Sequence, residues 1–219
     1  LAQTAFQELG LPAYNVVSPT TWAYDEGAAN LYRYNPEEAA RLLEEAGWVD
    51  SDGDGVREKD GETLTIDWPD NPAWSEAFNE LIIGYLSEVG FNVEYRSMDD
   101  GAAYEELLAG NYTLVYMYWT RPDPSPLRYL FHSENNNGGG AWSNFTYADL
   151  DNALADADTN IDEAARKQDY VIAQNIIMEN ALAIPMFTVN TSYLSAPSVQ
   201  GFTFDLEGLP FLYDVSLSQ

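Results

Sequence analysis

Residues 63–95 read TLTIDWPDNPAWSEAFNELIIGYLSEVGFNVEY, and this stretch decides the fold class. Its first six residues alternate polar and apolar side chains, as in a half-buried strand. The apolar residues of 78–89 then recur at helical spacing, and Gly90 stands where a helix commonly ends. Alternation returns over 91–95. This order of strand, helix and strand predicts an α/β structure.

The flanking sequence extends this alternation in both directions. Asn35 and Pro36, followed by two glutamates, predict a helix that begins there and ends at Gly47. Further helices are predicted over 102–109, 148–157 with Thr146 as N-cap, and 162–180, with a brief element near 127–131.

Strands are predicted over 183–188 and 191–194, and above all over 112–119. The nearly continuous apolar run at 112–119 predicts a strand that is buried on both faces, in the centre of a mixed sheet flanked by helices. We divide the chain into an irregular lead-in segment, 1–33, a lobe, 34–198, and a tail, 199–219. Turn signals at Gly201 and Gly208 separate the strand-like parts of the tail.

The composition predicts a packed core and limits the partners. Hydrophobic residues make up 46% of the 219 residues, too many for a disordered chain. Nine basic residues against 36 acidic ones give a net charge of -27, which repels nucleic acids and anionic membrane surfaces. The absence of cysteine and the single histidine exclude thiolate and multi-histidine metal centres.

An acidic loop offers the one candidate metal site. Asp50, Asp52 and Asp54 alternate with serine and glycine, and oxygens at such spacing can surround a calcium ion. Gly61 stands where the bidentate glutamate of a complete calcium loop belongs, so Glu58, Asp60 or Glu62 would have to replace it. A solvated acidic turn is the alternative.

Two aromatic segments supply the candidate ligand-binding residues. They combine ring faces for stacking with polar groups that orient a ligand, and comprise Tyr116, Tyr118, Trp119, Arg121, Asp123, Trp142, Ser143 and Asn144. The alternative is structural: the rings fill the core, Arg121 pairs with Asp123 in a local turn, and residues 142–144 start a helix.

No catalytic centre is predicted. His132, Ser133 and Glu134 are adjacent in the sequence, and adjacent side chains seldom face one another as nucleophile, base and orienting group must. A secreted hydrolase that uses two carboxylates remains the alternative from another functional class.

Several motifs together resemble family 5 solute-binding proteins, the dipeptide-, oligopeptide- and nickel-binding components of ABC importers. The motifs are YNPEEAARLLEEAGW at 34–48, DSDGDGVRE at 50–58, EVGFNVE at 88–94, LLAGNYTL at 107–114, Trp119 ahead of Asp123-Pro124, and WSNFTYADLD at 142–151. The series continues from Ala165-Arg166-Lys167 to Ile184-Pro185-Met186-Phe187, so it spans about residues 34 to 200 in the family order.

The resemblance implies a non-enzymatic, extracytoplasmic, monomeric receptor, either periplasmic or lipid-anchored at the cell surface. Its two lobes would close on a peptide or other small molecule and deliver it to the membrane subunits of a permease. This chain would be the C-terminal lobe, of the periplasmic binding protein type II kind, and its tail would return toward the other lobe. No cofactor is implied, with structural calcium as the one candidate.

The sequence departs from the family pattern next to Trp119. In peptide-binding relatives an acidic residue follows the corresponding tryptophan and binds the amino terminus of the peptide, whereas here no acid directly follows Trp119. An oligosaccharide, on which aromatic rings stack, is therefore an alternative ligand.

Overall fold

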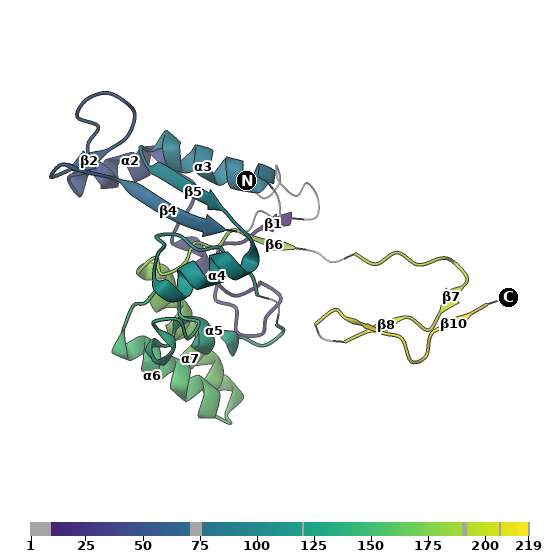
Figure 1. Cartoon of the computed structure of the whole chain (residues 1–219). Coiled ribbons are helices and arrows are strands. Elements are labelled where there is room, and N and C mark those ends of the chain that lie inside the picture. The colour runs from purple at the N-terminus through teal and green to yellow at the C-terminus, as the bar shows by residue number, and fades with distance from the viewer. Residues whose placement is uncertain (1–9, 71–75, 120, 190–191, 206, 219) are drawn as a thin grey trace.

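The computed structural model describes residues 10–70, 76–119, 121–189, 192–205 and 207–218. Helices and strands alternate over residues 36–109, helical elements alone follow up to residue 179, and strands close the chain (Figure 1). In chain order the elements are β1 Gly10–Pro12, η2 Ala28–Asn30, α2 Pro36–Glu45, β2 Glu58–Lys59, β3 Glu62–Thr63, β4 Thr65–Asp70, α3 Glu76–Glu88, β5 Asn92–Ser97, α4 Asp100–Ala109, α5 Pro126–Phe131, η3 Ser133–Asn135, α6 Ala148–Thr159, α7 Glu163–Glu179, β6 Phe187–Val189, β7 Val199–Gln200, β8 Thr203–Phe204, β9 Pro210–Phe211 and β10 Ser216–Leu217.

The predicted unit of strand, helix and strand is confirmed as β4, α3 and β5. The two strands pair in parallel, from Thr65 opposite Asn92 to Asp70 opposite Ser97. Trp68 from β4 and Phe78 from α3 are almost completely buried and belong to one core cluster. This unit directs the carboxyl end of β4 toward α4 (Figure 1).

A second core cluster lies between α6 and α7. Leu154 and Ile177 are fully buried in it, and Val17 and Ala23 from the lead-in segment join them. The Asn15 side chain donates a hydrogen bond of 2.8 Å to Gln174 of α7. The described part of the lead-in segment therefore packs against the helices of the lobe.

Most of the predicted helix ends are confirmed, and one is wrong. The Asn35 side chain accepts a hydrogen bond from the backbone of Glu38, and Gly110 has the left-handed conformation that ends α4. Tyr147, not Thr146, precedes α6 and caps it with no side-chain hydrogen bond. The Thr146 hydroxyl instead accepts a hydrogen bond from Asn136 at 3.3 Å.

The prediction of a buried central strand at 112–119 is wrong. No strand forms there. At its start, the backbone amides of Thr113 and Leu114 donate hydrogen bonds to the carbonyl of Asp67 in β4. Tyr118 and Trp119 are exposed by 59% and 45%. These two aromatic side chains line a pocket and are not part of the core.

The α/β class is confirmed, with five two-stranded pairings among the described residues, of which only the pair β4 and β5 is parallel. The strand predicted at 183–188 is reduced to β6, which pairs with β1. Of the strand predicted at 191–194, residue 191 lies outside the described residues and 192–194 form no strand.

The tail forms two antiparallel pairings, β7 with β10 and β8 with β9. It stands away from the helices (Figure 1). Gly201 and Gly208 have positive φ angles of 78°, as the predicted turns require. Among the residues that the structure describes, no helix has both the length and the apolar character needed to cross a membrane.

Candidate functional site

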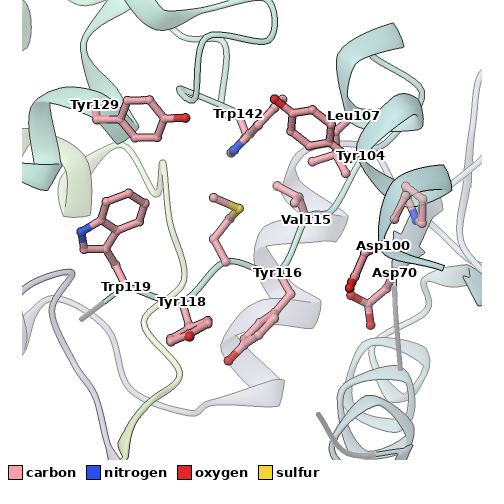
Figure 2. Close-up of a pocket in the computed structure, with 13 residues that line it drawn as sticks. Asp70, Asp100, Tyr104, Leu107, Val115, Tyr116, Tyr118, Trp119, Tyr129 and Trp142 are labelled. Atoms are coloured by element: carbon pink, nitrogen blue, oxygen red, sulfur yellow. The ribbon is translucent and has the colours of Figure 1, made fainter. Parts of the chain in front are cut away.

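A pocket of about 410 Å³ opens at the carboxyl end of β4 (Figure 2). Ligands commonly bind beyond the carboxyl ends of strands in α/β proteins, and this volume suits a small ligand. The lining comes from β4, α4, segment 115–119, α5 and the loop before α6. It consists of Pro69, Asp70, Asp100, Ala103, Tyr104, Leu107, Val115, Tyr116, Met117, Tyr118, Trp119, Tyr129 and Trp142.

The structure brings four of the predicted ligand-binding residues together in this pocket. Tyr116, Tyr118 and Trp119 come from one extended segment, and Trp142 faces them across the pocket (Figure 2). Tyr129 lies against Trp119 at a ring-centre distance of 5.6 Å. Such walls of ring faces can stack on planar or apolar parts of a ligand.

Tyr116 joins the pocket to the core. Its ring contacts Phe78 edge-on at 5.6 Å and stacks on Phe187 at 6.4 Å. Burial raises the pKa of the Tyr116 hydroxyl, and the negative charge of Asp70 raises it further. Tyr116 is thereby kept protonated and can donate a hydrogen bond.

The pocket also contains acidic and aromatic residues that were not predicted as site residues, namely Asp70, Asp100, Tyr104 and Tyr129. Asp70 ends β4, where it accepts hydrogen bonds from Asn79 at 3.0 Å and Tyr95 at 3.3 Å. Asp100 begins α4. Asp70 follows a predicted strand and Asp100 precedes a predicted helix, and only these positions could have indicated the two acids.

Asp123 does not line the pocket and instead pairs with Arg166 of α7. The two guanidinium nitrogens lie 3.2 and 3.1 Å from the two carboxylate oxygens, and the Trp22 indole donates a third hydrogen bond. Partial burial opposes ionisation of Asp123, but hydrogen bonds from Ser125 and Arg166 outweigh it and lower its pKa.

Arg121 also lies outside the pocket lining. Its guanidinium is 3.4 Å from Glu207 in the tail and lies over the Trp119 ring, 5.9 Å from its centre. The alternative of a local turn held by Arg121 and Asp123 therefore does not describe these residues, because each pairs with an acid or base distant in the sequence.

Ser143 and Asn144 follow Trp142 without lining the pocket. Asn144 adopts a positive φ of 52° and donates a hydrogen bond of 3.0 Å to the Tyr112 hydroxyl. That hydroxyl donates to the Trp142 carbonyl at 2.5 Å. In this structure Asn144 and Tyr112 thus help to position Trp142, and α6 begins only at Ala148.

The predicted calcium ligands lie in an exposed loop away from the pocket. One oxygen each from Asp50, Asp52, Asp54 and Glu58 comes within 4.8 Å of the others, and four carboxylates suit a hard cation. However, both oxygens of Asp50 already accept backbone hydrogen bonds, from Gly53 and Gly55. Calcium binding stays a prediction, since a solvated turn accounts for the same contacts.

Comparisons with known proteins agree on one family. Residues 1–141 match the model of the bacterial extracellular solute-binding proteins, family 5 Middle. The oligopeptide-binding protein AppA of Bacillus subtilis is 24% identical over 203 residues, which cover 89% of this chain and 37% of that protein. This chain therefore spans less than half the length of that relative.

Solved structures share the fold. The structure of Bacillus subtilis AppA in complex with a nonapeptide superposes with a TM-score of 0.81 at 21% identity, over 100% of this chain and 45% of that one. A mannohexaose-bound periplasmic oligopeptide-binding protein from Thermotoga maritima gives 0.75 at 20% identity, over 85% and 38%. The expected lobe of the periplasmic binding protein type II kind is confirmed.

Proposed function

The chain belongs to the bacterial extracellular solute-binding proteins of family 5, and from this premise we propose that it is one lobe of a peptide receptor of an ABC importer. The receptor captures di- or oligopeptides outside the cytoplasmic membrane. It is periplasmic or lipid-anchored, acts as a monomer, and delivers the peptide to the membrane subunits of its permease.

The observation that carries this proposal is the aromatic pocket at the carboxyl end of β4. Its walls are rings and apolar side chains, interrupted by only a few polar groups. This combination is typical of small-molecule sites, where ring faces supply contact area and polar groups set orientation. The second lobe would close over the pocket by a hinge motion and bury the ligand.

The segment 115–119 supports peptide as the ligand class. It is extended, forms no strand of its own, and lines the pocket. An extended peptide can pair its backbone with such a segment while its side chains occupy pockets, which gives affinity with tolerance of side-chain identity. Site residues are accordingly proposed as Tyr116, Tyr118, Trp119 and Trp142, with Arg121, Asp123, Ser143 and Asn144 acting from the surrounding loops.

An oligosaccharide is the second candidate ligand. The structural neighbour from Thermotoga maritima is bound to mannohexaose. The rings of Tyr118, Trp119 and Tyr129 in one pocket offer the flat faces on which sugars stack. In either case the family consists of binding proteins, and we propose that this chain has no catalytic activity.

Thermal unfolding of the two-lobed protein that carries this chain tests the proposal. Di- to pentapeptides, oligosaccharides and a hydrolase substrate panel are added in separate samples. A ligand that binds only the folded state raises the unfolding temperature. We expect peptides to raise it without being consumed, and Trp119→Ala to abolish the shift.

Tyr34→Ala is the matched control, because Tyr34 is a 72% exposed aromatic residue outside the pocket. It should leave the peptide-induced shift intact. A shift with sugars alone would replace the peptide by a sugar, turnover of any substrate would contradict the assignment as a receptor, and no shift with any compound would overturn the proposal.

A further inference from the structure

Two pairs of aromatic rings stand in the wall of the pocket. The ring centres of Trp119 and Tyr129 lie 5.6 Å apart, and those of Tyr104 and Trp142 lie 6.1 Å apart. All four rings line the pocket (Figure 2), and Trp119, Tyr129 and Tyr104 are exposed. Because exposed apolar surface gathered in one place commonly marks a binding site, these rings indicate a ligand with a flat apolar part.

Gly140 connects the two ring pairs. A β-carbon at this position would lie 2.3 Å from Cζ of Tyr129, so the Tyr129 ring packs directly on the backbone of this glycine. The φ angle of Gly140 is 122°, a conformation that residues with a side chain rarely adopt. Trp142 follows two residues later in the same loop. This loop therefore contacts Tyr129 and carries Trp142.

The Trp142 indole brings a hydrogen-bond donor to this wall. The side chain is only 8% exposed, and its N–H has no hydrogen-bond partner among the described residues. Figure 2 shows the indole nitrogen turned toward the pocket interior. Because buried donors are nearly always paired in folded proteins, this N–H indicates an acceptor that a bound ligand supplies.

The loop fixes the position of Trp142 by hydrogen bonds to its backbone. The Tyr112 hydroxyl donates to the Trp142 carbonyl and accepts a hydrogen bond of 3.0 Å from the Asn144 side chain. Burial raises the pKa of the Tyr112 hydroxyl, which keeps it protonated as a donor. The edge-on contact with Tyr104 holds the indole ring itself. A donor that is held in this way favours a ligand whose acceptor meets it at one place.

The surroundings of this donor favour an aromatic group that carries one acceptor. Ala103 and Leu107, on the same helix as Tyr104, add apolar side chains to the pocket lining. A peptide amide against such a wall would pair its carbonyl but withdraw its own N–H from water, which costs free energy unless that group is also paired. A phenol combines a ring face with an oxygen at the ring edge, whose lone pairs accept a hydrogen bond and whose hydrogen can rotate toward water.

We propose that the pocket is a side-chain subsite selective for tyrosine, whose ring packs among the aromatic residues and whose phenolic oxygen accepts a hydrogen bond from the Trp142 indole N–H. The inference rests on the proposed function and specifies which peptides the receptor prefers. Phenylalanine fills the same space but leaves the N–H unpaired. Tryptophan brings a second donor and no acceptor. At the other positions of the peptide, backbone pairing with segment 115–119 tolerates varied side chains.

Calorimetric titration of the two-lobed protein with substituted tripeptides tests this selectivity. Tyrosine, phenylalanine or tryptophan replaces each alanine of Ala-Ala-Ala in turn, so length and terminal groups stay constant. At the position that enters the pocket, tyrosine should improve affinity about tenfold or more over alanine, because its ring packs against other rings. It should exceed phenylalanine and tryptophan by about fivefold, because only the phenolic oxygen pairs with the indole N–H.

Trp142→Phe keeps a ring and removes the N–H. It should abolish the preference for the tyrosine peptide over the phenylalanine peptide, while both still bind more tightly than Ala-Ala-Ala. Trp48→Phe makes the same chemical change outside the pocket lining and should leave both preferences intact. In a nitrogen–proton correlation spectrum of the wild type, the indole signal that Trp142→Phe removes should move downfield with the tyrosine peptide and not with the phenylalanine peptide.

Equal affinity of the wild type for the tyrosine and phenylalanine peptides at every position would overturn the inference and leave peptide binding itself standing. This comparison needs no variant, so it decides the question even if Trp142→Phe fails to fold. A tyrosine preference that survives in folded Trp142→Phe would also overturn it, since the N–H would then not be its cause. If no peptide binds, the proposed function and this inference both fail.

Discussion

Replacing Arg166 by Met should destabilise the chain by removing the partner of Asp123. The guanidinium makes two hydrogen bonds to that carboxylate and one of 2.9 Å to the Ala157 carbonyl, and it lies over the Trp22 ring, 5.2 Å from its centre. Met fills a similar volume but provides no donor. Asp123 would then remain partly buried without its cation.

The expected loss follows from these contacts after discounting for solvent. The Asp123 side chain is 37% exposed and that of Arg166 29%, so water replaces part of each lost interaction. Charge-assisted hydrogen bonds are worth about 1.5–3 kcal/mol when well buried, and exposed ion pairs less than about 1 kcal/mol. We therefore expect the free energy of unfolding to fall by about 2 kcal/mol, or the unfolding temperature by about 4–8 °C.

The loss should depend on pH in one direction. Because the folded-state pKa of Asp123 is lowered, the pair with Arg166 stabilises the fold above the unfolded pKa, about 3.9. This contribution disappears as the pH falls through the folded-state pKa. The difference between wild type and Arg166→Met should be complete at pH 6 to 7 and should shrink below about pH 4.

Urea unfolding followed by circular dichroism from pH 3 to 7 measures both quantities. Lys167→Met is the control, because it removes a positive charge from an exposed neighbour on the same helix. It should alter the free energy of unfolding by less than about 0.5 kcal/mol. If the two variants lose the same stability, or if the loss in Arg166→Met is independent of pH, the assigned role of the Asp123 pair is refuted.

Three further predictions concern the core, the acidic loop and the loop behind the pocket. Leu154→Ala, at a fully buried position, should cost about 2–5 kcal/mol in urea unfolding, against less than about 1 kcal/mol for Leu108→Ala at a 43% exposed one; equal losses would contradict the core assignment. If the acidic loop binds calcium, added Ca²⁺ should raise the unfolding temperature and a chelator should reverse the increase. Asp50→Asn should abolish this response. Absence of any response in the wild type would favour the solvated turn. Tyr112→Phe removes the hydroxyl that donates to the Trp142 carbonyl and should weaken peptide binding severalfold with little loss of stability, about 0.5–1.5 kcal/mol, whereas unchanged binding would show that Trp142 needs no such support.

Local signals in the sequence predicted most elements because their causes are local. Asn35 caps the following turn through contacts within four residues, and Gly110 ends α4 through its own backbone conformation. The parallel pair β4 and β5 followed from two alternating segments joined by a helix. In each case the physical cause lies within the segment from which the prediction was made.

The sequence identified several aromatic residues of the pocket but not their structural setting, because the composition of a pocket wall resembles that of a core. The apolar run 112–119 predicted a buried strand, yet Trp119 is 45% exposed on a pocket wall. The hydrophobic pattern alone does not distinguish residues that pack in the core from residues that line a ligand pocket. The structure places Tyr116, Tyr118 and Trp119 of this run in one pocket, and their binding of a ligand stays a prediction.

The polar contacts around the pocket could not be predicted because they join residues that are far apart in the sequence. Asp123 meets Arg166 from α7, 43 residues later in the chain, and Asp70 and Asp100 come together only through the path of α3 and β5. With 36 acidic residues in the sequence, nothing local distinguishes these two. Their identification required the tertiary structure.

The central claim is that the pocket behind Trp119 binds peptide, and one calorimetric titration tests it most directly. The two-lobed protein is titrated with Ala-Tyr-Ala, alongside its Trp119→Ala and Tyr34→Ala variants. We predict saturable binding of one peptide per protein, weakened at least about tenfold by Trp119→Ala, since a stacking ring is worth more than about 1.4 kcal/mol, and unchanged by Tyr34→Ala. Absence of binding, or binding that Trp119→Ala leaves intact, would contradict the account.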